Sequence, residues 1–193
     1  MPVPESTAGA ALWRVFPWDP AAPPGTPFSP QFTVPAARQV HGRFDLGTSP
    51  VLYLAETPEH AVAEMLRPFT GRTLRPAHLR GAGHPLSLVA VTPSLEVRSG
   101  LADLTDPRVL VERGIRPDAL ASRDRTRTQT ISRALHDAGL AGFRWWSALH
   151  GDWHAVLLFA DRVPAGGLAY GTPETLATEH PAVAGAARAL NML

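Results

Sequence analysis

Two residue types are missing from the sequence, cysteine and lysine: all 18 basic residues other than histidine are arginine. Without cysteine there is no disulfide framework, no thiolate ligand for zinc or an iron–sulfur cluster, and no thiol nucleophile. Without lysine there is no Walker A phosphate loop, no Schiff base with pyridoxal phosphate and no Ser-x-x-Lys nucleophile. Any chemistry must therefore be carried by arginine, carboxylates, hydroxyls or histidine.

Long apolar runs and a strong net charge are missing too. No stretch of about 18 apolar residues occurs, so we expect no membrane-spanning segment. The first residues, MPVPESTAGAALWRVF, lack the basic and apolar regions of a secretory signal, which makes the cytoplasm the expected location. The net charge is only +1, and the densest basic cluster, SRDRTRTQT at 122–130, is interpreted as a loop and the first turn of a helix. Nucleic-acid-binding proteins usually show a clustered basic face, so we expect no direct contact with nucleic acid.

The 193 residues, 45% hydrophobic and 18% charged, suit one globular domain with a buried core. Seven of the 20 prolines fall within residues 17–35, which predicts an irregular excursion there rather than a helix. Elsewhere short apolar runs alternate with amphipathic segments. We predict strands at 12–16, 51–55, 86–92, 143–146 and 155–160, and helices at 58–67, from Asp106-Pro107, at 126–138 and in the Ala-rich C-terminal segment. This order predicts an α+β fold with a mixed or largely antiparallel sheet and flanking helices.

The stretch from 41 to 66, HGRFDLGTSPVLYLAETPEHAVAEML, carries two residues that suit a ligand site on a loop and a strand. Arg43 lies in a Gly-Arg-Phe turn, and a planar guanidinium can hold a phosphate through two hydrogen bonds. Tyr53 alternates with Leu52 and Leu54 and so faces the other side of the strand. Its ring can stack on a flat ligand group.

The helix that follows is predicted to begin at Thr57-Pro58, an N-cap followed by proline at the first helical position. Glu64 lies to one side of the apolar stripe of this helix and can face a cleft at the edge of the core. The stripe consists of Ala61, Val62, Met65, Leu66 and Phe69.

A second region of interest is WWSALHGDWHAVLLF, late in the chain. No Gly-x-Ser-x-Gly surrounds Ser147, so we do not interpret it as an α/β-hydrolase nucleophile. His150, Asp152 and His154 have loop-like spacing without a His-Glu-x-x-His helix, and we expect no metal site. Each candidate residue taken singly also has a purely structural explanation. Arg43 could be an exposed loop arginine and Tyr53 a packed ring. Glu64 could be a solvated carboxylate and Ser147 a serine at a strand end.

Their combination resembles the RES domain family, named for its Arg, Glu and Ser. In that family an arginine in a Gly-Arg turn precedes a Tyr-Leu-Ala strand by ten residues, and a helical glutamate follows the tyrosine by eleven. Arg43, Tyr53 and Glu64 have these spacings, and Ser147 lies before a final apolar strand as the family's serine does. The resemblance covers residues 12–162, with 1–11 and 163–193 as terminal extensions.

The resemblance implies an ADP-ribosyltransferase-like fold and a toxin that consumes NAD+ as a substrate, with no further cofactor. Glu64 and Arg43 would be catalytic. Arg43, Tyr53, Ser147 and, as a second anion contact, Arg14 would bind NAD+. The implied partner is an Xre-type helix-turn-helix antitoxin, in a homodimeric or toxin–antitoxin assembly.

The sequence departs from the family at two places near the serine. Trp146 stands where the family often has proline, and His154 where it often has asparagine. Three interpretations stay open: an NAD+ glycohydrolase or phosphorylase, a protein ADP-ribosyltransferase on the same scaffold, and a catalytically inactive binding module.

Overall fold

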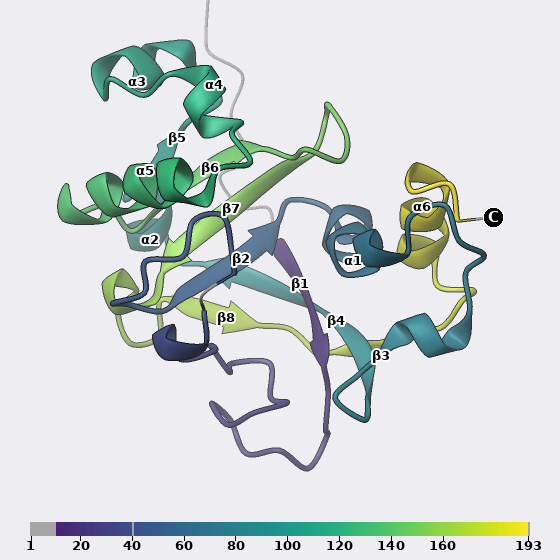
Figure 1. Ribbon diagram of the computed structural model, residues 1–193. Coiled ribbons are helices and arrows are strands. Elements are labelled where there is room, and N and C mark those ends of the chain that lie inside the picture. Colours follow the sequence, from purple (N-terminus) through teal and green to yellow (C-terminus); the bar gives the residue numbers. More distant parts are fainter. Residues whose placement is uncertain (1–10, 40, 193) are drawn as a thin grey trace, which may run out of the picture.

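The computed structural model describes residues 11–39 and 41–192, so the predicted N-terminal extension, 1–11, lies outside the described residues except for Ala11. Within them, nine strands form one mixed sheet (Figure 1). Seven strands follow the order β3-β4-β1-β2-β7-β6-β5, and β8 and β9 also pair with β4. The β5–β6 pair is parallel and the other neighbours are antiparallel. The predicted α+β class and mixed sheet are confirmed.

The strands are β1 (Leu12–Pro17), β2 (Val51–Ala55), β3 (Arg80–Gly81), β4 (His84–Pro93), β5 (Leu101–Asp103), β6 (Gly142–Trp146), β7 (His154–Phe159), β8 (Leu168–Tyr170) and β9 (Glu174–Thr175). The helices are α1 (Pro58–Leu66), α2 (Leu95–Ser99), α3 (Pro107–Glu112), α4 (Pro117–Leu120), α5 (Arg125–Asp137) and α6 (Pro181–Ala189). Short 3₁₀ turns lie at Ala36–Arg38, Arg67–Phe69, Pro76–Leu79 and Ala160–Arg162.

Local sequence signals account for the ends of the longer elements. Thr57 caps α1 by accepting a hydrogen bond from the main-chain nitrogen of His60, 3.2 Å away. Asp106 and Asp124 cap α3 and α5 in the same way. Gly139 has φ of +81° just after α5, the left-handed conformation that glycine adopts without strain. The predicted excursion at 17–35 contains no helix or strand after Pro17.

Two groups of helices cover one face of the sheet. Helices α1 and α6 pack over β4 and β1, whereas α3, α4 and α5 pack over β6 and β7 (Figure 1). Three alternate residues of β2 face these helices. Val51 packs in the core under α3–α5, and Ala55 packs in the core under α1 and α6. Tyr53 lies between these two cores. The centre of β2 is therefore left uncovered by helices, and this position becomes the site described below.

The apolar stripe of α1 differs in part from the prediction. Ala61, Val62 and Leu66 are buried, but Met65 is 39% exposed. A histidine, His60, is fully buried in its place. Phe69 lies in the turn after α1, only partly buried, and stacks on His78.

The segment after residue 162, expected to be a terminal extension, packs onto the domain. Strand β8 pairs with β4, and α6 places Val183 and Ala186 fully buried in the core that it shares with α1. No helix among the described residues has the length and apolar character that crossing a membrane requires.

Candidate active site

A cavity of about 670 Å³ opens over the centre of β2, between α1 and the loop at 41–44. Arg14, Arg43, Tyr53, Glu64 and Ser147, the five residues predicted from the sequence, all line it. They come from β1, a loop, β2, α1 and the loop after β6. The fold therefore brings together residues up to 133 positions apart in the sequence.

The guanidinium of Arg43 makes one hydrogen bond to the main chain and leaves one buried donor unpaired. Its Nη2 donates a hydrogen bond to the main-chain oxygen of Leu120, 2.5 Å away at the end of α4. Its guanidinium lies 5.1 Å from the centroid of the Phe44 ring. The Nε atom is buried and has no hydrogen-bond partner among the described residues. Burial, and secondly the charge of Arg67, lower the pKa of Arg43. A buried donor without a partner is costly.

Helix α5 holds the backbone of the arginine loop. Thr128 Oγ1 donates to the main-chain oxygen of Arg43, Gln129 Nε2 to that of Gly42 at 3.2 Å, and Ser132 Oγ to that of Phe44 at 2.8 Å. Thr128 and Ser132 are fully buried. Three consecutive carbonyls are thus anchored to a rigid element, so the arginine loop has a fixed position.

Tyr53 is held by its hydroxyl while its ring faces the cavity. The hydroxyl donates to Asp45 Oδ1 at 2.9 Å and accepts from the main-chain nitrogen of Phe44 at 3.0 Å. The second oxygen of Asp45 accepts from the nitrogen of Gly42 at 2.6 Å. Burial, and secondly the charge of Asp45, raise the pKa of Tyr53, so its hydroxyl stays protonated. The Trp145 ring meets the Tyr53 ring edge to face, with the ring centroids 6.3 Å apart.

Glu64 is the one carboxylate among the described residues that line the cavity. Its side chain is 45% exposed. Its Oε1 lies 3.4 Å from Nε2 of the buried His60, and its Oε2 lies 3.9 Å from Nη1 of Arg67. Five arginines share the cavity wall: Arg14, Arg43, Arg67, Arg123 and Arg125. The cavity is therefore strongly cationic, with a single anionic group.

Ser147 sits in the turn that joins β6 to β7. Its nitrogen donates to the main-chain oxygen of Trp153 at 2.7 Å, and its Oγ accepts from the nitrogen of Leu149 at 3.1 Å. Because its Oγ acts as an acceptor in this contact, the hydroxyl proton stays available to a ligand in the cavity.

Arg14 lines the cavity and also anchors a neighbouring loop. Its Nη1 donates to the main-chain oxygens of Pro30 and Phe32, at 3.1 and 2.9 Å. Burial lowers its pKa. These bonds fasten the proline-rich excursion, whose Thr33 and Val34 form part of the cavity wall.

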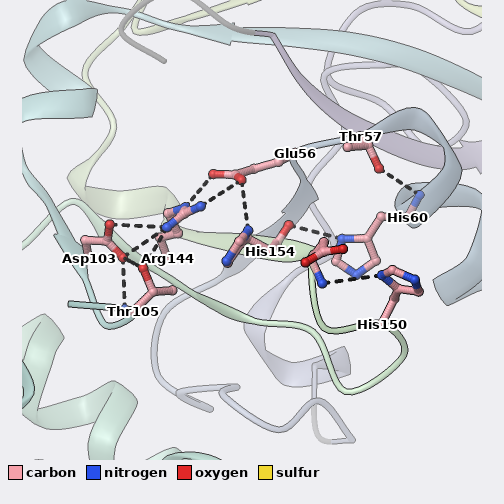
Figure 2. A network of polar contacts seen from close by, with 9 residues as sticks. Glu56, Thr57, His60, Asp103, Thr105, Arg144, His150 and His154 are labelled. Atoms are coloured by element: carbon pink, nitrogen blue, oxygen red, sulfur yellow. Dashed lines mark hydrogen bonds and ion pairs between the residues drawn. The ribbon is translucent and has the colours of Figure 1, made fainter. Parts of the chain in front are cut away.

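A polar network joins side chains of β5, β6 and β7 to the residue that follows β2 (Figure 2). Arg144 on β6 binds Glu56 through Nε at 2.5 Å and Nη2 at 3.0 Å, and binds Asp103 on β5 at 3.2 Å. Glu56 also lies 3.4 Å from Nδ1 of His154 on β7. His150 instead contacts the nitrogen of Asp152. His150, in the loop, and His154, at the start of β7, therefore have different partners (Figure 2).

The sequence did not point to three contributors to the site: Asp45, His60, and the two buried hydroxyl residues of α5, Thr128 and Ser132. A usable signal existed for the last of these, because Thr128, Ser132 and Leu135 recur at the spacing of one helical face and all three are buried. The role of His60 was not predicted because this polar residue occupies a core position in an amphipathic helix.

Comparison with known proteins identifies the family. The RES domain model matches residues 11–178. The chain belongs to the RES domain family. The matched range contains every lining residue of the cavity. No curated protein matches the sequence closely enough to serve as a characterised relative.

Solved structures support the fold of this RES domain. A chain from the crystal structure of the M. tuberculosis MbcT–MbcA toxin–antitoxin complex superposes with a TM-score of 0.59. The match covers 87% of the present chain and 84% of that one, at 19% sequence identity. At this identity the likeness concerns the fold.

Proposed function

We propose that this RES domain is the toxin of a toxin–antitoxin pair and consumes NAD+ by cutting the bond between nicotinamide and ribose, with water or phosphate as the acceptor. The observation that carries the proposal is the convergence of Arg43, Tyr53, Glu64 and Ser147 on one cationic cavity that contains a single carboxylate. The family of the chain, and the similarity of its fold to a member of a toxin–antitoxin complex, support the same conclusion.

The charge of the cavity suits the pyrophosphate of a dinucleotide. Arg43 presents a buried Nε–H that has no protein partner, and its position is fixed by Leu120 and by α5. Charge-assisted hydrogen bonds from arginine to phosphate are among the stronger polar contacts in proteins. We expect Arg43 to bind the pyrophosphate, with Arg67, Arg123 and Arg125 adding to the positive potential.

The carboxylate suits the reacting end of the same molecule. In the reaction the bond between ribose C1′ and the pyridinium nitrogen breaks, and its electron pair neutralises that nitrogen. Positive charge develops on the ribose, and an oxygen of water or phosphate then bonds to C1′. Water loses a proton in this step. Glu64 would stabilise the developing charge and orient the ribose hydroxyls. Nicotinamide leaves as a neutral molecule, so a strong general acid is not required.

Tyr53 and Ser147 would hold the nicotinamide end. The exposed face of the Tyr53 ring offers a flat apolar surface, and its hydroxyl is already bound to Asp45, so the ring orientation is fixed. The free hydroxyl proton of Ser147 would hydrogen-bond the carboxamide or the ribose.

We expect the partner to be an antitoxin of the Xre type, with a helix-turn-helix domain. Co-expression of the two chains should restore growth of a host that stops growing when this chain is expressed alone. Growth unaffected by the free chain would contradict the toxin assignment.

The deciding experiment incubates the purified, partner-free protein with NAD+, with and without phosphate, and identifies the products by mass spectrometry. We expect nicotinamide and ADP-ribose, or ADP-ribose 1″-phosphate when phosphate is present. Glu64→Gln and Arg43→Ala should each abolish the reaction. Glu59→Gln on the same helix and Arg38→Ala, neither of which lines the cavity, serve as matched controls. Unchanged NAD+ with a folded protein would overturn the proposal.

A further inference from the structure

We propose that His60 is a positioning residue that holds Glu64 through one shared proton, so that the pair acts as a unit. The inference rests on the proposed function, because it assigns a role in that reaction. Sequence analysis gave His60 no role, and it does not belong to the arginine, tyrosine, glutamate and serine set.

The first observation is the fixed orientation of the His60 ring. The side chain is fully buried, although it reaches the cavity wall. Its Nδ1 lies 3.1 Å from the main-chain oxygen of His154 (Figure 2). Its ring stacks on that of Trp153, with the centroids 5.2 Å apart and the planes 23° apart. These two contacts hold the ring from its edge and from its face.

The second observation is the state of the other ring nitrogen. A carbonyl oxygen only accepts hydrogen bonds, so Nδ1 must carry a proton. In a neutral imidazole, Nε2 would then present a lone pair. Nε2 is buried and makes no hydrogen bond within the described residues, and it lies 3.4 Å from Glu64 Oε1. A neutral ring would thus present a lone pair toward a carboxylate, whereas a proton on Nε2 makes the same contact attractive.

Two groups near the His60 ring can interact favourably with a proton on Nε2. Glu64 supplies the negative charge from the next turn of α1, and Trp153 offers an aromatic face to a cation. Arg67 lies on the far side of Glu64. On the side of β7, His154 is paired with Glu56, which Arg144 in turn binds, and His150 lies against Trp153. Glu64 is therefore the carboxylate that faces His60.

The consequence is a carboxylate whose position depends on its partner. Glu64 is nearly half exposed, and Arg67 makes a second, longer ion pair with it at 3.9 Å. A hydrogen bond from Nε2 would keep it aimed at the ribose. Loss of that proton turns attraction into repulsion, and the side chain is then free to move toward Arg67. A misplacement of about 1 Å can cost about 100-fold in rate.

The test compares three variants by their kcat and KM for NAD+ between pH 6 and pH 9. His60→Phe keeps a ring against Trp153 but has no donor, and we expect kcat to fall about tenfold or more with little change in KM. His60→Gln keeps an N–H that does not titrate. It should retain much of the activity, but its rate should not fall as the pH rises, whereas that of the native protein should. His150→Phe makes the same change against the same tryptophan without approaching Glu64, and should behave as the native protein.

Two results would overturn the proposal: native kcat in a folded His60→Phe, or the same pH profile in His60→Gln and in the native protein. A second measurement does not depend on NAD+ consumption. The nitrogen NMR signals of His60 should report protonation at both ring nitrogens and should change in Glu64→Gln. If NAD+ is not consumed by the native protein, the proposed function fails and the NMR result alone decides on the pair. Signals that are insensitive to Glu64→Gln would refute it.

Discussion

Thr128 donates a hydrogen bond to the main-chain oxygen of Arg43, a residue 85 positions earlier in the sequence. Thr128 is fully buried. Its hydrogen bond joins α5 to the loop that carries the proposed phosphate-binding arginine. The position of the Arg43 backbone is thus set by a helix that lies outside the Gly-Arg turn. This link between helix and loop leads to the first prediction.

Replacing Thr128 with valine keeps the shape of the side chain but leaves the carbonyl of Arg43 without its donor. We expect a loss of about 1–3 kcal/mol in unfolding free energy and a raised KM for NAD+. Thr130→Val is the matched control on the same helix, because Thr130 Oγ1 is exposed and bonds only the oxygen of Thr126. Urea unfolding and steady-state kinetics measure the two effects. Equal behaviour of the two variants would show that the loop does not depend on α5.

Gly42 is the residue whose lack of a side chain permits the tyrosine–aspartate contact. A Cβ atom at this position would overlap Oδ1 of Asp45 and lie 2.6 Å from the hydroxyl of Tyr53. We therefore expect Gly42→Ala to displace both groups, to lower the melting temperature by several degrees and to abolish NAD+ consumption. Gly151→Ala, which meets nothing within 4 Å, should leave both unchanged. An active Gly42→Ala would mean that Tyr53 need not be held by Asp45.

The sequence predicted most of the main elements because their signals are local. A short apolar run marked β2, Thr57-Pro58 marked the start of α1, and Gly139 marked the end of α5. The shortest strands escaped prediction. Strands of two or three residues, such as β3 and β5, contain too few positions to show a period, and they exist because β4 and β6 offer them an edge.

The site was predictable to the extent that its residues follow one another on a single strand–helix unit. Arg43, Tyr53 and Glu64 lie within 22 positions, so their spacing carries information about their placement. The support of the site comes from elsewhere. The bond of Thr128 and the contact between His60 and the oxygen of His154 span 85 and 94 positions, and no local pattern encodes them.

Replacing Phe69 should lower the stability of the fold without changing the activity of the site. Its ring packs on the core shared by α1 and α6 and stacks on His78, with the centroids 4.2 Å apart, but it does not line the cavity. Phe69→Ala should lower the unfolding free energy by about 1–3 kcal/mol, less than for a fully buried ring, because part of the side chain remains in solvent. The rate per folded molecule should be unchanged. Leu95→Ala, at a position 71% exposed, should alter neither quantity.

His154 makes the stability of the protein depend on pH in a direction that can be derived. Burial, and secondly the charge of Arg144, lower the pKa of His154 from its ordinary value of 6.5, although Glu56 opposes the shift. As the pH falls below about 6.5, the unfolded chain takes up a proton at this residue more readily than the native protein does. Unfolding is thereby favoured at lower pH, and the stability that this group contributes is lost in that direction.

His154→Asn removes this titration and introduces the residue that the RES family often has at this place. It leaves the main-chain oxygen that contacts His60. We expect the variant to lose less unfolding free energy than the native protein between pH 7.5 and pH 5.5, as measured by urea unfolding at each pH. His84→Asn is the control, since that partly buried histidine lies outside the network of Arg144 and Glu56. The same loss of stability in His154→Asn and in the native protein would place the pH dependence on other histidines.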